Sequence, residues 1–190
     1  WIISDGVTVT ISKPKIHWVE DNMYSTSNTE LKVSWNAEDS FAAIHTYDVY
    51  VVTNNTGIAD QSAFKVTENT LSDETFTEHR IATTFNYTFT NPTALFEDGE
   101  KYYPVIIAHN SAGLESVPSG HDGVTVDASV PTFNDISDGD YQNSNTNLSV
   151  TWNAEDTHTA IKEYELEVWQ IGDDSNTLVT SNNISLADGT

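Results

Sequence analysis

Two pairs of acidic residues are the first groups in this sequence that could do chemistry. Glu38-Asp39 and Glu155-Asp156 each follow a tryptophan at the same spacing. Two carboxylates can hydrolyse a glycosidic bond when they stand on opposite walls of a cleft, but each of these pairs is adjacent in a single turn. An aspartate in such a turn accepts hydrogen bonds from backbone amides and closes it. We therefore favour a structural role for both pairs.

A third acidic group, formed by Asp135, Asp138 and Asp140, is the densest in the chain. Oxygen-rich acidic loops suit calcium, a hard cation. The spacing matches no complete calcium loop, so these residues are weak calcium candidates, and no other metal or cofactor is expected. The histidines show no spacing typical of zinc enzymes and are expected to be ordinary surface or loop residues. They are His17, His45, His79, His109, His121 and His158.

Other catalytic patterns are missing from the sequence. It has no Gly-x-Ser-x-Gly motif for a nucleophilic serine and no glycine-rich phosphate loop. It also has no cysteine, which excludes disulfides, thiolate metal sites and cysteine nucleophiles. The sequence therefore predicts a protein that is not an enzyme.

The charge of the chain restricts its partners. Seven Lys and Arg stand against 29 Asp and Glu, for a formal net charge of −22. Nucleic acid is not expected as a partner because phosphate binding needs a basic face, and anionic membrane surfaces are disfavoured for the same reason. Membrane insertion is not expected, since no apolar run approaches the length of a span.

Four Asn-x-Ser/Thr sequons are candidate glycosylation sites if the source is eukaryotic or archaeal. They begin at Asn54, Asn86, Asn147 and Asn183. Asn86 and Asn147 flank or lie in predicted strands, where an outward-facing position could carry sugar. Surface glycans are also a candidate partner of the protein.

An internal repeat organises the elements that must position these groups. Residues 31–47 occur again without a gap as residues 148–164, about 117 residues later, which is right for one small domain. Apolar and polar residues alternate in both copies, as is typical of half-buried strands. The sequence predicts an all-β protein with tandem β-sandwiches. In the first repeat, strands are expected at 11–19, 30–36, 45–52, 63–67, 82–90, 101–109 and 123–127, and a surface loop without a core role at 69–80.

Three motifs of the first unit are characteristic: Leu31-x-Val-x-Trp35, Ile44-x-x-Tyr47, and Ala108-x-Asn110-x-x-Gly113 followed by Ser116. With these motifs the repeat resembles fibronectin type III domains, which are immunoglobulin-like β-sandwiches, over the whole first unit and about half of the second. The resemblance implies that Trp35 lies in the core between two sheets.

The resemblance also assigns a corner to the stretch from Leu95 to Tyr102. Tyr102 would begin a strand and hydrogen-bond back to the corner, which Leu95 and Asp98-Gly99 would form. Pro104 departs from the family, in which a β-branched residue is usual at this place. Proline cannot donate to a ladder, so either the strand is bulged at Pro104 or the nitrogen faces no partner.

Alignment of the two copies divides the chain into three parts. Residues 1–10 match the strand at 123–127 and are expected to form an orphan terminal strand. Residues 11–128 are expected to form a complete fibronectin type III-like domain. Residues 129–190 are expected to form a partial one, which has a strand at 176–185 corresponding to the strand at 82–90 but lacks its last strands.

An incomplete sandwich exposes unpaired amides and an apolar groove, which leaves two interpretations open. The chain is a segment of a longer tandem array, or the terminal strand of one subunit completes the partial domain of another copy, giving a filament. The expected donor residues are Ile2, Ile3, Val7 and Val9. The expected acceptor groove contains Leu148, Val150, Trp152, Leu166 and Val168.

The sequence thus predicts an extracellular or cell-surface structural protein, a subunit or segment of a filament or adhesive fibre whose partners are copies of itself. The alternative is a spacer or ligand-binding module of a large secreted or cell-surface protein. An accessory module of a secreted polysaccharide-degrading enzyme belongs to the same alternative.

Overall fold

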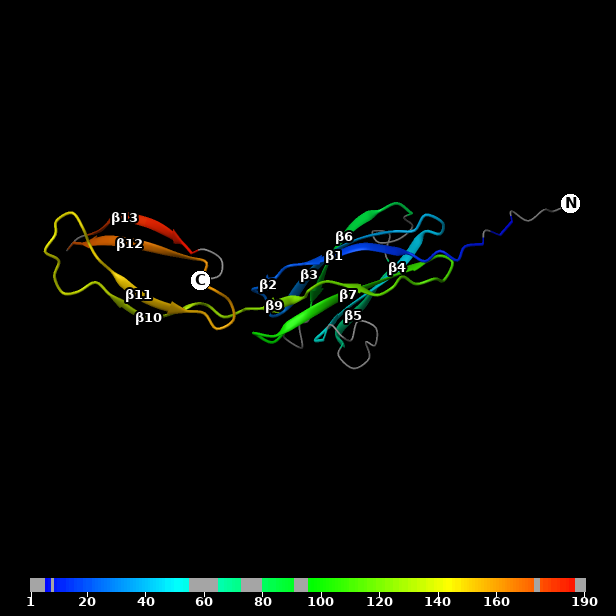
Figure 1. Ribbon diagram of the computed structural model, residues 1–190, viewed down its shortest axis with the longest axis horizontal. Helices are drawn as coiled ribbons and strands as arrows, with labels where there is room; N and C mark the ends of the chain where they lie inside the picture. The colour runs from blue at the N-terminus through cyan, green and yellow to red at the C-terminus, as the bar shows by residue number, and fades with distance from the viewer. Residues whose placement is uncertain are drawn as a thin grey trace. The chain divides into compact units, whose positions relative to one another are not determined.

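The computed structural model describes residues 6–7, 9–54, 65–72, 80–90, 96–172 and 175–186. The chain divides into two compact units, Trp1–Ala128 and Ser129–Thr190. Within the described ranges the regular secondary structure consists of strands, so the predicted all-β class is confirmed (Figure 1). In the same ranges, no helix has the length and apolar character needed to cross a membrane.

The described part of the first unit contains two sheets. One has the strand order β1-β3-β6, and the other has the order β2-β9-β7-β4-β5, with β8 paired to β7. The pairings are antiparallel except that of β2 with β9, which is parallel. The strands are β1 (Lys15–Asp21), β2 (Tyr24–Ser25), β3 (Glu30–Glu38), β4 (Ile44–Val52), β5 (Lys65–Leu71), β6 (Thr83–Thr90), β7 (Lys101–Asn110), β8 (Ser119–Gly120) and β9 (Val124–Val126).

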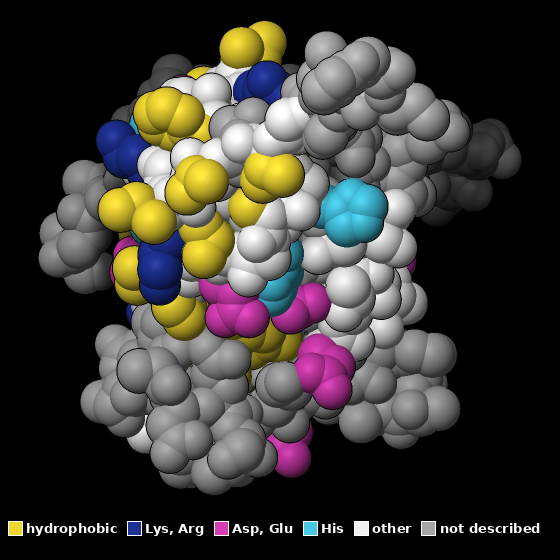
Figure 2. Space-filling view, turned by 90° about the vertical axis from the view of Figure 1, so that its right-hand side faces the viewer, with side chains coloured by type: hydrophobic (Ala, Val, Ile, Leu, Met, Phe, Trp, Pro, Cys, Tyr) yellow, Lys and Arg dark blue, Asp and Glu magenta, His cyan; other side chains and the backbone are white. Residues whose placement is uncertain are grey.

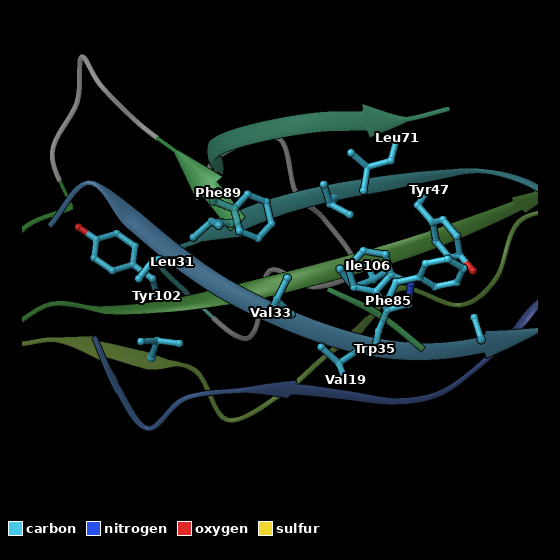
Figure 3. Close-up of a cluster of buried hydrophobic side chains, with 14 of the residues drawn as sticks. Val19, Leu31, Val33, Trp35, Tyr47, Leu71, Phe85, Phe89, Tyr102 and Ile106 are labelled. Carbon is cyan, nitrogen blue, oxygen red and sulfur yellow. The ribbon is translucent and has the colours of Figure 1, made fainter. Parts of the chain in front are cut away.

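The core of the first unit lies between these sheets, as in a β-sandwich (Figure 3). Strand β3 contributes Leu31, Val33 and Trp35 from one sheet, and β4 and β7 contribute Tyr47 and Ile106 from the other. All five side chains are 2% exposed or less. Successive residues of a strand point to opposite faces, which is why the alternating pattern of the sequence locates this core.

Three aromatic rings form the centre of the core. The ring centroid of Trp35 lies 5.3 Å from that of Tyr47, edge to face, and 5.7 Å from that of Phe85. Tyr47 and Phe85 complete the triangle at 5.4 Å. Aromatic pairs of this kind contribute about 0.5–1.5 kcal/mol each beyond their buried area. Trp35 therefore lies between the sheets, as expected, and joins them.

Asp39 closes the turn after β3, which confirms the structural role predicted for the acid pairs. Its Oδ1 accepts hydrogen bonds from the backbone amides of Phe41 at 2.9 Å and Ala42 at 3.0 Å. In the second unit, Oδ1 of Asp156 accepts from the amides of His158 at 3.1 Å and Thr159 at 3.0 Å. The same turn is thus built twice.

Asp39 also ties this turn to the end of β7. Its Oδ2 accepts a hydrogen bond from Asn110 Nδ2 at 2.9 Å, and both residues are buried. Oδ1 of Asn110 in turn accepts from the amides of Ala112 at 3.1 Å and Leu114 at 2.9 Å. Buried polar groups are tolerated when they are hydrogen-bonded. Asp39 and Asn110 hold the turn after β3, from one sheet, against the turn after β7, from the other.

Tyr102 forms the corner that the resemblance implied. Its hydroxyl accepts a hydrogen bond from the backbone amide of Glu97 at 2.8 Å, and its ring meets Phe96 edge to face at 5.1 Å. Phe96 is 1% exposed and is the apolar residue that fills this end of the core. Leu95, which we expected in the corner, lies outside the described residues.

The bulge considered at Pro104 is absent, because β7 continues through it in an unbroken register with Pro104 opposite Val51. On its other edge, β7 pairs with β9 up to Tyr102 and with β8 from Val105 onward. Pro104 therefore lies in the gap between two partner strands. Proline has no backbone N–H to donate, so it disrupts the hydrogen bonds of a sheet least where its strand has no partner on that edge.

The prediction of a surface loop at 69–80 was wrong for its first residues. Strand β5 extends to Leu71, which is 6% exposed and belongs to the core. The residues before it, Glu68, Asn69 and Thr70, are exposed on a strand that pairs only with β4 in the described sheet. The prediction failed because an edge strand with polar residues has the same composition as a surface loop. Residues 73–79 lie outside the described ranges.

The described part of the second unit consists of two antiparallel pairs, β10 (Thr132–Ser137) with β11 (Thr151–Glu155) and β12 (Glu163–Ile171) with β13 (Asn176–Ser185). Strand β13 has the predicted bounds, but it corresponds to β5 rather than to β6, because it pairs with β12 as β5 pairs with β4. The short connection between β12 and β13 makes them a hairpin. The described residues of this unit contain no counterpart of β6, β7 or β9.

Replacing Asp39 by asparagine should reduce stability in a pH-dependent way. Burial alone would raise the pKa of Asp39, but hydrogen bonds from Asn110 and from the amides of Ala42 and Phe41 outweigh it and hold the pKa below its ordinary value. A carboxylate with a lowered folded-state pKa stabilises the protein above its ordinary pKa and loses that effect as the pH falls through the folded pKa. Asp39→Asn should therefore cost about 1.5–3 kcal/mol at pH 7, and less below about pH 4.

Urea unfolding of the 190-residue chain at pH 7, 5 and 3 measures this difference. Asp140→Asn, at an exposed position of the second unit, is the control and should leave the first unit unchanged. If the difference in unfolding free energy between the wild type and Asp39→Asn stayed constant down to pH 3, the lowered pKa assigned to Asp39 would be contradicted.

Gly123 should not tolerate alanine. Its φ of +89° is one that L side chains rarely adopt, and a Cβ would lie 2.6 Å and 2.7 Å from ring carbons of Tyr103 and 2.9 Å from the carbonyl oxygen of Tyr102. Crowding of this kind costs about 1–3 kcal/mol, and the φ adds about 1–2 kcal/mol. Gly113 has a φ of +79° with nothing within 4 Å. Gly113→Ala is therefore the matched control and should lose clearly less in the urea midpoint, whereas equal losses would show that the contact with Tyr103 is unimportant.

Candidate functional site

The predicted acceptor residues are copies of core residues of the first unit, but they are more exposed. The core residues are 2% exposed or less, whereas Leu148 is 66% exposed and the other four acceptor residues are partly exposed. In chain order, Leu148, Val150, Trp152, Leu166 and Val168 correspond to Leu31, Val33, Trp35, Val49 and Val51. We call these five residues of the second unit the acceptor face.

The structure places three residues of the acceptor face on the more buried side of strands from its two strand pairs. Burial alternates along β11 and β12, so that Trp152, Leu166 and Val168 lie on the more buried side of their strands. The ring centroids of Trp152 and Tyr164 lie 5.4 Å apart, edge to face, like those of Trp35 and Tyr47 in the first unit. The second unit therefore begins the same core that the first unit completes.

The acceptor face lacks the side chains that close the core of the first unit. There, Phe85 of β6, Ile106 of β7 and Val124 of β9 pack on the copies of the acceptor residues. The described part of the second unit has no strand in these places. Large apolar surfaces left open in this way mark sites of protein interaction. Further exposed apolar side chains of this unit are Val130, Phe133, Ile136, Ile171, Leu178 and Val179.

The described donor residues are also uncovered. Val7 and Val9 are 88% and 85% exposed, although their copies in β9, Val124 and Val126, are at most 1% exposed. Ile11 continues the alternation and is 91% exposed. The face of the molecule seen in Figure 2 carries several surface hydrophobic side chains. Ile2 and Ile3 lie outside the described residues.

A second candidate site lies in the first unit, at the end of β1 and in the connection from β8 to β9. Asp21 Oδ1 lies 2.9 Å from His121 Nδ1, and the same nitrogen contacts Asp122 Oδ1. One potential ligand atom from each of the three residues lies within 4.8 Å of the others. His121 lies in a loop with its side chain 45% exposed, in line with the expectation of a surface or loop histidine, but no pattern in the sequence indicated that its side chain meets two acidic neighbours. Asp21 and His121 are 100 positions apart, so only the fold shows that they meet.

The three groups perturb one another. Burial raises the pKa of Asp21 above its ordinary value, although His121 and the backbone amide of Gly123 act in the opposite direction. The hydrogen bond to Asp21 raises the pKa of His121. The Asp21 side chain is 0% exposed, whereas those of His121 and Asp122 are 45% and 65% exposed.

The weak calcium candidates are not gathered into a group. Asp135 lies in β10, and Asp138 and Asp140 lie in the turn that follows it. Among the described residues, the cluster of Asp21, His121 and Asp122 is the one group of three or more acidic or histidine ligands close enough to share an ion. A calcium site at Asp135, Asp138 and Asp140 stays a prediction.

Three of the candidate glycosylation sites are exposed. Asn86 lies in β6, Asn147 precedes β11, and Asn183 lies in β13. The side chain of Asn86 accepts a hydrogen bond from Ser34 Oγ at 2.7 Å on the outer side of the sheet. Asn54 is partly buried. Glycosylation stays a prediction at all four sites.

Comparisons with protein-family models, curated proteins and solved structures found no match to this chain. The likeness to fibronectin type III domains therefore remains a resemblance. It is carried by the residues named above and by the two-sheet core around Trp35.

Removing the two equivalent tryptophans should have unequal effects. Trp35 is 0% exposed, and truncating a buried aromatic residue costs about 3–5 kcal/mol. Trp152 is partly exposed, so Trp152→Ala should cost its unit much less than Trp35→Ala costs the first unit. Urea unfolding of each variant at low protein concentration, followed by circular dichroism, compares them. Equal losses would mean that the acceptor face is already covered in the isolated chain.

Proposed function

We propose that the protein is a structural subunit or segment of an extracellular filament or adhesive fibre, built from fibronectin type III-like sandwiches. Strands of another copy would cover the acceptor face of its second unit. The observation that carries this proposal is the contrast between the two units. Five core residues of the first unit are fully buried, whereas their equivalents in the second unit are partly or largely exposed.

The proposed donor segment shows the same contrast in exposure. Residues 5–9 repeat residues 122–126, Asp-Gly-Val-Thr-Val. In the first unit, Val124 and Val126 of this sequence enter the core from β9. Val7 and Val9 have the same spacing and no comparable cover. An exposed copy of β9 and a second unit whose described residues include no β9 are complementary, which supports exchange between copies by strand addition.

In this proposal, most of the free energy of strand addition comes from covering the acceptor face. Burying one Val or Leu fully contributes about 1.5–3 kcal/mol, whereas fixing the backbone of one residue costs about 1–2 kcal/mol. A donated strand with one valine in every two residues therefore gains little from its own side chains. Covering Trp152, Leu166 and Val168 and pairing open strand edges would supply the rest.

One donated strand does not complete the second unit. In the first unit, β9 pairs with β7 on one side and with β2 on the other. The counterpart of β2 is residues 141–142, where Tyr141 is 95% exposed, but the described residues include no counterpart of β7. The proposal therefore requires a second strand in the place of β7.

The alternative function is a spacer or ligand-binding module of a large secreted or cell-surface protein, including an accessory module of a polysaccharide-degrading enzyme. The observation that favours it is the first unit, whose core is closed by its own strands. Such a unit needs no partner copy, and a chain used in this way would stay monomeric.

Assembly of the purified 190-residue chain tests the proposal. Negative-stain electron microscopy and sedimentation velocity should show regular fibres for the wild type. They should show none for the double variant Val7→Asp, Val9→Asp, because charged side chains cannot enter the apolar face. Val117→Asp is the matched control, since Val117 is 72% exposed and lies outside the donor segment.

The charge of the chain supplies a further readout. A net charge of −22 opposes association of copies, so added salt should speed fibre formation by screening. A wild type that stays monomeric at high concentration and high salt overturns the proposal in favour of the spacer. Fibres that persist in the double variant would show that residues 7–9 are not the donor.

A further inference from the structure

We propose that Asp21, His121 and Asp122 bind one divalent transition-metal ion, of the zinc type, through an imidazole nitrogen and two carboxylates. This site would join the end of β1 to the connection between β8 and β9. It does not depend on the proposed assembly, because all three residues belong to the first unit.

The carboxylate of Asp21 is buried and only partly compensated. Its side chain is 0% exposed, and Oδ2 has no partner with hydrogen-bond geometry among the described residues. The backbone amide of Gly123 lowers the pKa of this carboxyl, but burial has the larger effect and raises it. A buried carboxylate is costly unless a charge or hydrogen bonds compensate it. A cation beside Asp21 would supply that compensation.

The position of His121 shows where the cation would lie. Its Nδ1 faces Asp21 Oδ1 at 2.9 Å and also contacts Asp122 Oδ1. In the metal-free protein, a proton on Nδ1 is held between the two carboxylates. A metal ion binds deprotonated imidazole, so the ion would replace this proton and meet the same two oxygens.

The donor set selects the class of ion. Calcium and magnesium prefer oxygen ligands, whereas one imidazole with two carboxylates suits zinc, cobalt, nickel, copper or manganese. The three ligand atoms lie within 4.8 Å of one another, and His121 Nδ1 lies 2.9 Å from Asp21 Oδ1. Two ligands bonded tetrahedrally at about 2.0–2.2 Å to one ion lie about 3.4 Å apart. The exposed side chains of His121 and Asp122 can move outward to admit the ion, and water can take the remaining positions.

His109 offers a matched comparison in the same unit. It also stands beside two carboxylates, with Nε2 2.9 Å from Asp48 Oδ2 and Nδ1 3.7 Å from Glu115 Oε1. These two acids meet opposite nitrogens of the ring, so the three groups do not converge on one point. The variant His109→Ala is therefore a control for the general attraction of cations to an acidic surface.

The sequence repeats do not copy the nitrogen ligand. Asp138 is the copy of Asp21 and Asp5 is the copy of Asp122, but Ser4 stands in the place of His121. One ion per 190-residue chain is therefore expected.

Calorimetric titration of the EDTA-treated 190-residue chain with zinc chloride at pH 7.5 tests the site. The wild type should bind one zinc ion, and cobalt should give a visible absorption spectrum that reports the nitrogen ligand. His121→Ala should abolish this binding, and Asp122→Asn should weaken it at least tenfold. His109→Ala should bind as the wild type does. Calcium chloride should not displace the zinc.

Asp122→Asn keeps the test meaningful if His121→Ala unfolds, because the Asp122 side chain is 65% exposed. Circular dichroism in EDTA checks both folds. Zinc should also raise the thermal midpoint of the wild type but not that of Asp122→Asn. The proposal is overturned if the wild type binds no zinc, if Asp122→Asn binds as tightly as the wild type, or if His109→Ala loses binding to the same degree.

Discussion

An apolar sheet face has to be covered, and the rest of this structure depends on how each unit meets that constraint. In the first unit, the three-stranded sheet supplies Trp35 and the larger sheet supplies Tyr47, and the two residues meet inside a closed core. The second unit repeats the contact through Trp152 and Tyr164 but has no described strands beyond it. One motif thus appears once as a finished core and once as an open surface, within a single chain.

Hydrogen-bonded polar groups fix the turns that border the closed core of the first unit. Asp39 and Asn110 join the turn after β3 to the end of β7 at one end of the unit. Tyr102 and the amide of Glu97 fix the corner before β7. Each of these groups forms its hydrogen bond with a residue of another element, which fixes the turns. In the second unit Asp156 keeps its turn, but the link that Asp39 makes to Asn110 has no counterpart in the described residues.

Features with a local cause could be predicted from the sequence. Alternation located the strands around Leu31 and Val49, and the turn chemistry of Asp39 follows from its place after a strand. Features that depend on pairing could not be predicted. Leu71 is a single inward residue on a polar edge strand, so it looked like part of a loop. The pairing of β13 with β12 follows from a short connection rather than from composition. Asp21 and His121 meet only because β1 and the β8–β9 connection lie side by side, which no spacing in the sequence reveals.

The parallel pairing of β2 with β9 has a mechanical consequence. These strands lie near the two ends of the first unit in the sequence, and they are joined at Tyr24 with Thr125 and at Ser25 with Val126. Tension along the chain would pull β2 and β9 in opposite directions along their axes. Inter-strand hydrogen bonds run across the strands, so such a load shears them together instead of opening them one by one. A unit connected in this way resists stretching better than one whose outer strands form a hairpin.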